Sequence, residues 1–308
     1  MYDLVIIGGG PAGVAAGVYA ARKQIKSLLI TETFGGQSVV SPDIQNWIGT
    51  PSISGDKLAK DLEEHIRTYA KDIVDIHTGV RVQRVEKIEN GFSVETSDGN
   101  KVESKTVLVA TGSVRRKLTV PGAEEFDNKG LTYCATCDGP LFSGQDIVVI
   151  GGGNAAFESA AQLLAYAKSV TLLNRSNTFR ADEITVEKVL EHPNMKAIKN
   201  AVIKEVKGDA FVTGLVYTDT TTDTDIELAV SGIFVEIGLI PNTDFVEGVA
   251  ERNDHNQIVT DPKNQRSTVK GIWAAGDCTD GLYHQNNIAA GDAVKALEDI
   301  YMYLHTGQ

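Results

Sequence analysis

The feature that most constrains the fold is a glycine-rich pattern that occurs twice in this chain of 308 residues. In each copy a short apolar strand leads into closely spaced glycines, an alanine-containing helix and a second apolar strand. In such a βαβ unit, the backbone N–H groups at the helix N-terminus can bind a pyrophosphate. Two copies predict an α/β protein with two Rossmann-like dinucleotide-binding domains. The length of the chain also suggests two domains, at about 150 residues per domain.

The first copy lies at the N-terminus, where an apolar strand leads into Gly8-x-Gly10-x-x-Gly13. The glycines provide a tight turn, close approach of the backbone to the pyrophosphate, and close packing of helix on strand. The next strand, Ser27–Thr31, ends directly before Glu32, whose carboxylate can accept hydrogen bonds from ribose hydroxyls. Because strand, helix, strand and acid are all present, we expect a dinucleotide site.

The second copy follows a strand at Ile147–Ile150 and reads Gly151-x-Gly153-x-x-Ala156, with Asn154 at the start of the helix. We expect this loop to bind the pyrophosphate of a second dinucleotide in the same way. Two dinucleotides in one enzyme are typical of a flavin paired with a nicotinamide, because hydride can pass from one to the other.

The end of the next strand, Ser169–Leu173, bears on which nicotinamide cofactor binds. The strand is followed by Asn174 and Arg175 instead of an acid, and Arg180 comes a little later. An acid here favours a free 2′-hydroxyl, whereas a nearby arginine accommodates a 2′-phosphate. The sequence therefore favours NADPH, with the alternative that both arginines are solvated surface charges.

Three further segments indicate that the first domain is split. Strands are expected within Lys105–Ser113 and Val230–Thr243, and a third, within Thr268–Gly281, ends at Gly276-Asp277 before a helix from about Gln285 to Leu304. Asp277 can hold a ribityl hydroxyl, and the helix start can place its dipole on a reduced flavin. Alternating residues with Asn-Gly and Asp-Gly turns predict β-hairpins before the first of these strands.

We therefore predict an FAD-binding domain formed by residues 1–114 and 245–308, with an NAD(P)H-binding domain, residues 115–244, inserted into it. The chain is expected to cross between them near Arg115–Pro121 and Leu239–Phe245. Both crossings contain a proline and turn-forming residues, so both could act as hinges.

Two of the three cysteines, Cys134 and Cys137, form a C-x-x-C motif that Asp138 follows directly. The motif alone permits a redox dithiol, half of a metal site or an accident of composition. A zinc site needs about two more Cys or His ligands, whereas Cys278 lies alone and the histidines form no paired spacing. We predict no metal and favour a redox dithiol, beside which a carboxyl group can shuttle a proton.

Composition excludes several classes of protein. The net charge of −12 argues against nucleic acid as a partner, since phosphate binding needs clustered Lys and Arg. The longest apolar runs are strand-sized, so no membrane span is expected. No basic and apolar leader precedes the first strand, and the odd number of cysteines does not suggest a disulfide framework. We expect a cytoplasmic protein.

The motifs GGGPAG, FGGQ, ATG, YCATCDGPLF, GGGNAA and AAGDCT occur in this order, and together they resemble those of low-molecular-weight thioredoxin reductases. The chain is also similar to the flavoprotein subunit of alkyl hydroperoxide reductase without its extra N-terminal domain. The resemblance implies a homodimeric enzyme that passes electrons from NADPH through FAD and a redox-active disulfide to thioredoxin or a thioredoxin-like protein. It also implies two alternating domain orientations.

By the same resemblance, Cys137 would face the flavin, Cys134 would attack the disulfide of the partner, and Asp138 would be the general acid. The residues implied to bind FAD are Gly8, Gly10, Pro11, Gly13, Glu32, Gly36, Gln37, Asn46, Val82, Thr111, Gly112, Gly276, Asp277, His284, Gln285 and Asn286.

The chain departs from the family pattern at two places. Thioredoxin reductases usually carry His-Arg-Arg-x-x-x-Arg where this chain has Asn174-Arg175-Ser176-x-x-x-Arg180, and the peroxide-reductase flavoproteins, which prefer NADH, carry Glu. We predict NADPH with a reduced preference, so NADH is possible. His284 replaces a common arginine. Three alternatives stay open: a reductase for a peroxiredoxin system using NADH, a ferredoxin-dependent reductase, and a flavin redox sensor that does not turn over.

Overall fold

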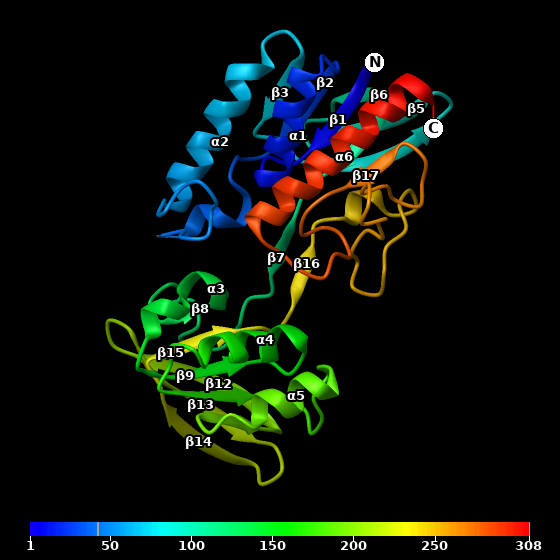
Figure 1. Cartoon of the computed structure of the whole chain (residues 1–308). Coiled ribbons are helices and arrows are strands. Elements are labelled where there is room, and N and C mark those ends of the chain that lie inside the picture. Colours follow the sequence, from blue (N-terminus) through cyan, green and yellow to red (C-terminus); the bar gives the residue numbers. More distant parts are fainter. Residues whose placement is uncertain (42, 308) are drawn as a thin grey trace. The chain divides into compact units, whose positions relative to one another are not determined.

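The computed structural model describes residues 1–41 and 43–307, which form two compact units. Residues 1–114 and the segment from Ile240 onward form the first unit, and residues 115–239 form the second. In Figure 1 the first unit runs from blue to teal and again from yellow to red, and the second is mainly green. The predicted α/β fold, with a second Rossmann-like domain inserted into the first, is confirmed.

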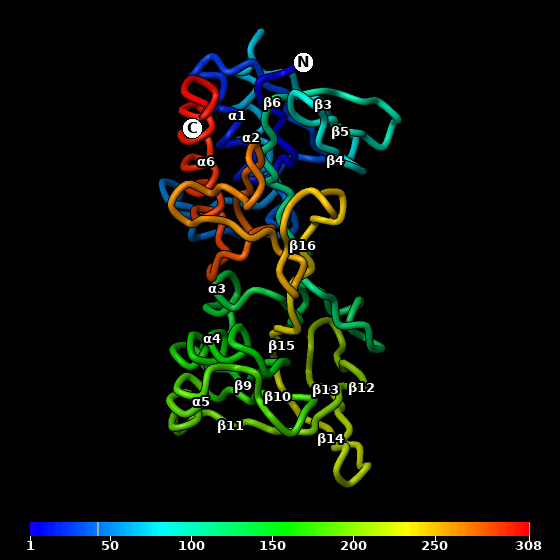
Figure 2. Tube along the Cα trace, turned by 90° about the vertical axis from the view of Figure 1, so that its right-hand side faces the viewer, coloured from blue at the N-terminus to red at the C-terminus, as the bar shows by residue number. Residues whose placement is uncertain are grey.

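The first unit is built on a mainly parallel sheet with the order β3-β2-β1-β6-β5-β4, and β17 pairs with β6. Its strands are β1 (Tyr2–Ile7), β2 (Ser27–Thr31), β3 (Val74–Thr78), β4 (Val82–Ile88), β5 (Gly91–Thr96), β6 (Lys101–Val109) and β17 (Ile272–Ala274). Its helices are α1 (Pro11–Arg22), α2 (Gly55–Ala70) and α6 (Asn286–Thr306), with 3-10 turns η1 (Gly36–Val40) and η3 (Asp244–Val246). Helices α1 and α6 lie side by side (Figure 2). The antiparallel pairing of β4, β5 and β6 confirms the expected hairpins.

The apolar run of β1 is buried on both faces of this sheet. Leu4 and Ile6 pack in the cluster that contains the three helices, whereas Val5 and Ile7 pack in the cluster on the other face. A strand covered on both sides has a continuous apolar sequence instead of an alternating one. The packing on both faces holds the carboxyl end of β1, and the glycines after it, in a defined position.

The second unit contains a parallel sheet with the order β11-β10-β9-β15-β8 and an antiparallel sheet with the order β12-β13-β14. The strands are β8 (Leu131–Thr132), β9 (Asp146–Ile150), β10 (Ser169–Leu173), β11 (Met195–Ile198), β12 (Ala201–Gly208), β13 (Val212–Asp219), β14 (Thr224–Ala229) and β15 (Gly232–Val235). Helices α3 (Ala135–Asp138), α4 (Asn154–Leu163) and α5 (Glu183–Leu190), and the turn η2 (Gly139–Phe142), complete the unit. Both fingerprints therefore form the expected strand–helix–strand order.

The return crossing lies between residues 239 and 240, within the predicted crossing Leu239–Phe245, whereas the domain boundary was predicted between residues 244 and 245. Strand β16 (Leu239–Pro241) pairs with β7 (Ser113–Arg115). Just after β16, the N–H of Asn242 donates to Gly112 O over 3.0 Å, and Thr111 Oγ1 donates to Asn242 O over 2.6 Å. These bonds attach the segment after β16 to the first unit, which moves the boundary toward the N-terminus.

The Ala-Thr-Gly segment leaves the sheet earlier than predicted, because β6 ends at Val109 and not near Ser113. Gly112 has a φ of +62°, a conformation that glycine adopts without steric cost. The backbone therefore turns at the end of β6, where cofactor contacts were expected.

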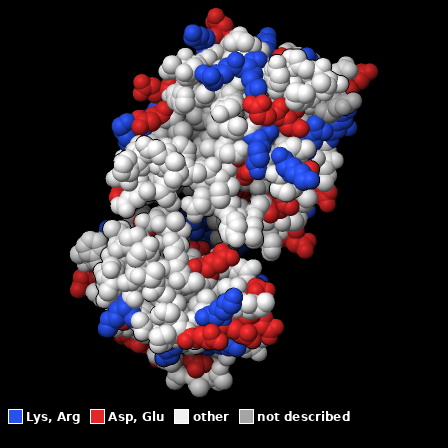
Figure 3. Space-filling model, viewed as in Figure 1, with Lys and Arg blue, Asp and Glu red and all other residues white. Residues whose placement is uncertain are grey.

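On the face in Figure 3, positive and negative side chains are interspersed, and the described residues there form no continuous basic surface. Across residues 1–41 and 43–307, every helix is too short or too polar to cross a membrane.

Candidate functional site

The first unit contains a cavity of about 630 Å³ at the carboxyl ends of its parallel strands. Residues that directly follow β1, β2, β6 and β17 line it, which is where open α/β sheets bind ligands. The predicted residues that line this cavity are Gly8, Gly10, Pro11, Glu32, Gly36, Gln37, Val82, Thr111, Gly112, Gly276, Asp277 and Asn286. The fold thus gathers most of the expected FAD residues, from both ends of the chain, around one space.

The glycines after β1 differ in what a side chain would meet. A Cβ on Gly8, whose φ is +123°, would lie 2.2 Å from Ala110 O, and one on Gly13 would lie 1.9 Å from Gly8 O. These two glycines allow the backbones to approach each other. A Cβ on Gly10 would meet only Gly36 Cα, at 3.8 Å, and would otherwise occupy the cavity. The space left open at the N-terminus of α1 fits a pyrophosphate.

Glu32 lies at the end of β2 as predicted, and its carboxylate is already held by an arginine. Arg81 Nε donates a hydrogen bond of 2.6 Å to Glu32 Oε2, and both residues line the cavity. Arg81 was not predicted from the sequence, although it precedes Val82, which was expected in the site. Since the ion pair uses Oε2, Glu32 can still accept from ribose hydroxyls through Oε1.

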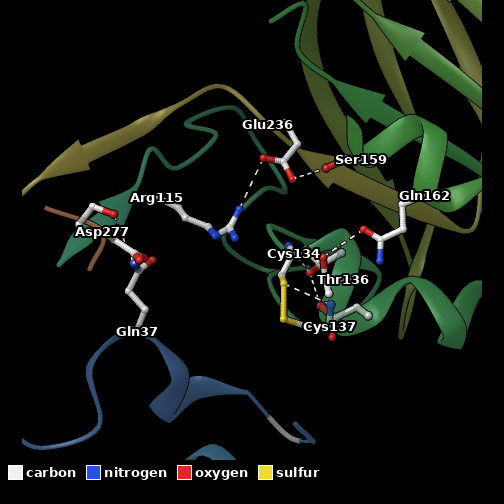
Figure 4. Close-up of polar contacts among 12 residues, drawn as sticks. Gln37, Arg115, Cys134, Thr136, Cys137, Ser159, Gln162, Glu236 and Asp277 are labelled. Carbon is white, nitrogen blue, oxygen red and sulfur yellow. Dashed lines mark hydrogen bonds and ion pairs between the residues drawn. A yellow bond between two sulfur atoms is a disulfide. The ribbon is translucent and has the colours of Figure 1, made fainter. Parts of the chain in front are cut away.

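The carboxylate of Asp277 is the centre of a polar cluster at the end of β17. Gln37 Nε2 donates to Asp277 Oδ2 over 3.2 Å (Figure 4), and His284 Nδ1 lies 3.5 Å from Asp277 Oδ1. Asn46 Nδ2 donates to Gln285 Oε1 over 3.2 Å. His284, Asn46 and Gln285 therefore support the rim of the site and do not line the cavity, and Gly13 is buried in α1.

Further lining residues that were not predicted from the sequence include Ser113, Asn242 and Phe245. Of these, Asn242 belongs to the segment that the sequence had assigned to the second unit. Cys278 is fully buried beside this region, with its sulfur 3.4 Å from Ala275 O. Burial raises the pKa of the Cys278 thiol to about 11, so it stays protonated and acts as a small packing residue.

In the second unit, Cys134 and Cys137 form a disulfide across the first turn of α3, with their Cα atoms 5.3 Å apart (Figure 4). Cys134 caps the helix, and its Sγ accepts a 3.2 Å hydrogen bond from the N–H of Cys137. Thr136 Oγ1 donates to Gln162 Oε1 over 3.0 Å, which ties α3 to α4. Both cysteines are half-buried.

Asp138 ends the same helix, and its carboxyl accepts a short hydrogen bond from Thr132 Oγ1. Thr132 Oγ1 also accepts from the N–H of Cys134 over 3.3 Å, so one hydroxyl connects the acid to the disulfide. Burial raises the pKa of Asp138, against the opposing effects of the Thr132 hydrogen bond and the Arg115 charge. Neither Thr132 nor Arg115 was predicted as a site residue, because neither belongs to the motif.

The glycine-rich loop of the second unit, like that after β1, leaves a space that a side chain would fill; we call each of these two loops a cradle. A Cβ on Gly151, whose φ is +152°, would lie 2.3 Å from Glu236 O, whereas one on Gly153 would meet nothing within 4 Å. Ala156 is fully buried in α4. Asn154 Oδ1 accepts from the N–H of Asp182 over 2.8 Å, so it fixes the loop before α5. The open side of Gly153 fits a pyrophosphate at the N-terminus of α4.

The loop after β10 presents exposed cations. Asn174 is buried, and its Nδ2 donates to Ser176 O and Thr178 O, so it organises the loop. Arg175 and Arg180 are exposed, and neither guanidinium has an ion-pair partner among the residues that the structure describes. Lys199, which follows the neighbouring strand β11, lies with Nζ 4.7 Å from the ring of Phe179. It is a third cation at this edge, and it was not predicted from the sequence.

Within the described part of the chain, no group of three or more His, Cys, Asp or Glu side chains is placed to hold a metal ion.

Comparisons with known proteins agree with this geometry. The family model for pyridine nucleotide-disulphide oxidoreductases matches residues 2–293. Thioredoxin reductase from Streptococcus pyogenes is 34% identical with a TM-score of 0.89, and the alignment covers 99% of both chains. Thioredoxin reductase from Giardia duodenalis is 30% identical with a TM-score of 0.91 over the same shares.

Two curated relatives share a higher sequence identity with this chain than these two structures do. A protein named NADH dehydrogenase from Bacillus subtilis is 41% identical over 303 residues, which are 98% of this chain and 58% of the relative. An Escherichia coli protein that is one component of alkyl hydroperoxide reductase is 41% identical over 305 residues, again 98% and 58%. The chain therefore spans less than two thirds of the length of these curated relatives.

Proposed function

Because the chain belongs to the pyridine nucleotide-disulphide oxidoreductase family, as a flavoprotein disulfide reductase of the low-molecular-weight thioredoxin reductase type, we propose that it reduces a thioredoxin-like protein with electrons from NADPH. The observation that carries the proposal is the half-buried Cys134–Cys137 disulfide with Asp138, whose pKa is raised, at its side. The proposal includes a homodimer and a cytoplasmic location.

In this proposal each of the two glycine-rich loops binds one cofactor. In the first unit, the N-terminus of α1 would hold the FAD pyrophosphate, with Glu32 at a ribose and Asp277 at the ribityl chain. In the second unit, Gly151 to Gly153 would hold the pyrophosphate of the nicotinamide cofactor. When bound, these cofactors supply a hydride and then the two electrons that reduce the disulfide.

Two electrons and two protons convert the disulfide to two thiols, which the partner then reoxidises. Cys134 is suited to be the nucleophile, because the N–H that already donates to its sulfur would stabilise a thiolate there. Its attack on the partner disulfide forms a mixed disulfide and releases a partner thiolate. Asp138 can donate a proton to that thiolate. Attack of the Cys137 thiolate on Cys134 Sγ then restores the disulfide and releases the reduced partner.

The experiment uses the FAD-loaded protein under anaerobic conditions, with NADPH and oxidised thioredoxin. The wild type should bleach its flavin absorbance and reduce thioredoxin, whereas Cys137→Ser should stop at a mixed disulfide between Cys134 and thioredoxin. Cys278→Ala is the matched control and should keep turnover, because the Cys278 sulfur is buried in the packing. Full turnover by Cys137→Ser would show that the cysteine assignment is wrong.

A second candidate has the same chemistry with NADH and a peroxide-reducing partner. It is favoured by the names of the curated relatives, one an NADH dehydrogenase and one a component of alkyl hydroperoxide reductase. The loop at Arg175, Arg180 and Lys199 favours NADPH instead, because three exposed cations can bind a 2′-phosphate. Steady-state kinetics decides between them: a kcat/KM higher with NADH than with NADPH would move the second candidate ahead.

A further inference from the structure

The carboxyl group of Glu236, in the second unit, has no role in the chemistry proposed above. Glu236 directly follows β15, and its side chain is only 11% exposed. Ser159 Oγ, on α4, donates a 2.8 Å hydrogen bond to Glu236 Oε1, and Arg115 Nη1 lies 3.5 Å from Oε2 (Figure 4). Burial raises the pKa of this carboxyl. Because burying an acid costs free energy, a buried carboxyl with a raised pKa is a candidate for function.

Glu236 lies at the switch point of the parallel sheet. Strand β9 is followed by β10 and β11 on one side and neighbours β15 on the other, so the carboxyl ends of β9 and β15 flank the crevice in which α/β folds bind ligands. A Cβ on Gly151 would lie 2.3 Å from Glu236 O, which shows how closely the two strand ends approach. Glu236 is therefore next to the loop that would hold the pyrophosphate.

The position of the fingerprint indicates which half of a dinucleotide would lie near Glu236. The residues after β10, Asn174 and Arg175, occupy the place where this fingerprint binds the adenosine ribose. With the pyrophosphate at the N-terminus of α4, the other half must extend to the opposite side of β9. That side is formed by β15 and β8. The nicotinamide half would thus lie beside Glu236.

Glu236 has the hydrogen-bonding capacity for a neutral donor at this place. An ionised carboxylate accepts about four hydrogen bonds and donates none. Ser159 occupies one acceptor position on Oε1, and Arg115 lies at ion-pair distance from Oε2. A primary amide such as that of the nicotinamide ring offers two N–H donors.

We propose that Glu236, positioned by Ser159 and balanced by Arg115, binds the amide group of the nicotinamide ring and selects it against a carboxylate. The inference rests on the proposed function, since it needs a pyridine nucleotide in the second unit. A ring carrying a carboxylate would bring a second negative charge against Glu236. The neighbouring charge of Glu158 acts in the same direction, and like charges in a partly buried site are unfavourable.

The experiment is titration calorimetry of the FAD-loaded protein with three ligands. These are NADP⁺, its nicotinic acid analogue, and 2′-phospho-ADP-ribose, which lacks the ring; the NAD⁺ counterparts are titrated in parallel. The wild type should bind NADP⁺ roughly tenfold more tightly than the nicotinic acid analogue, as one charge-assisted hydrogen bond predicts. Glu236→Gln should lose most of this ratio and keep the affinity for 2′-phospho-ADP-ribose.

Two further variants make the test specific. Ser159→Ala should reduce the ratio in part, and Ser159→Thr, which keeps the hydroxyl, should restore it. Glu227→Gln removes an exposed acid on β14 and is the matched control, for which no change is expected. Unchanged affinity for 2′-phospho-ADP-ribose also verifies that each variant is folded.

Each outcome has a separate meaning. A wild-type ratio close to one, or an unchanged ratio in Glu236→Gln, overturns the inference and leaves the proposed function intact. If the wild type binds none of the dinucleotides, the proposed function of the second unit fails, and this inference fails with it.

Discussion

The backbone N–H of Cys137 donates a hydrogen bond to the sulfur of Cys134 over 3.2 Å. The reverse contact cannot form, because Cys134 precedes the first turn of α3 and its own N–H donates to Thr132 Oγ1. The two cysteines therefore occupy different electrostatic environments, although the motif presents them as a pair. A hydrogen bond to a thiolate lowers its pKa.

We predict that after reduction the Cys134 thiol has a lower pKa than the Cys137 thiol. The rate of alkylation against pH, measured on the reduced Cys137→Ser and Cys134→Ser variants, reports each remaining thiol separately. Cys278 adds no reactive background because it is fully buried. A midpoint for Cys137 below that for Cys134 would reverse the proposed roles.

Asp138→Asn should lower turnover with thioredoxin by roughly a hundredfold, the usual scale for loss of a general acid. Burial raises the pKa of Asp138 above its ordinary value of 3.8, so the proton remains bound at higher pH than in the unfolded chain. Asp138 is thus fully protonated below pH 3.8, and the proton is lost as the pH rises through the folded pKa.

The wild-type kcat should therefore fall as the pH rises through the folded pKa of Asp138. In Asp138→Asn this decrease of kcat with pH should be absent. The same proton makes the folded protein less stable as the pH rises through the folded pKa, and the variant should not share this loss. The checks are kcat profiles and urea midpoints at matched pH values. If kcat still decreases over the same pH range in Asp138→Asn, the decrease must come from another ionisable group.

The cations at the end of β10 and β11 should act on NADPH alone. Arg180→Ala and Lys199→Ala should each raise KM for NADPH by about tenfold, the scale of one charge-assisted contact, and leave KM for NADH nearly unchanged. Steady-state kinetics at two salt concentrations measures this, since a 2′-phosphate contact weakens with salt. Lys188→Ala, on α5, is the control. Equal effects on both cofactors would mean that these side chains act on the loop and not on the phosphate.

Gly10→Val should give a folded protein without flavin. A Cβ at Gly10 meets only Gly36 Cα, at 3.8 Å, so the chain itself tolerates a side chain that would fill the pyrophosphate space. Gly291→Ala, in α6, is the control, because nothing lies within 4 Å of its Cβ either. The ratio of flavin to protein absorbance and the circular dichroism spectrum check both. Normal flavin content in Gly10→Val would place the pyrophosphate elsewhere.

The local elements could be predicted from the sequence because their causes are local. Strands β2 and β10 have the bounds expected for them, Ser27–Thr31 and Ser169–Leu173, since short apolar runs ending at polar residues define them. Glycines at defined spacings mark the two cradles, because only glycine allows the approach seen between Gly8 and Ala110 O. The cysteine pair could also be predicted from the sequence, because its two members are separated by only one helical turn.

Only the tertiary structure decided which side chains surround these motifs. Arg81 reaches Glu32, Arg115 acts on Asp138, and Glu236, which follows β15, accepts a hydrogen bond from Ser159 on α4. Their positions depend on the order of strands in each sheet, which brings together carboxyl ends that are far apart in the chain. A spacing pattern has no information about such neighbours. Local chemistry determined the cradles and the dithiol, whereas sheet order determined the charges that tune them.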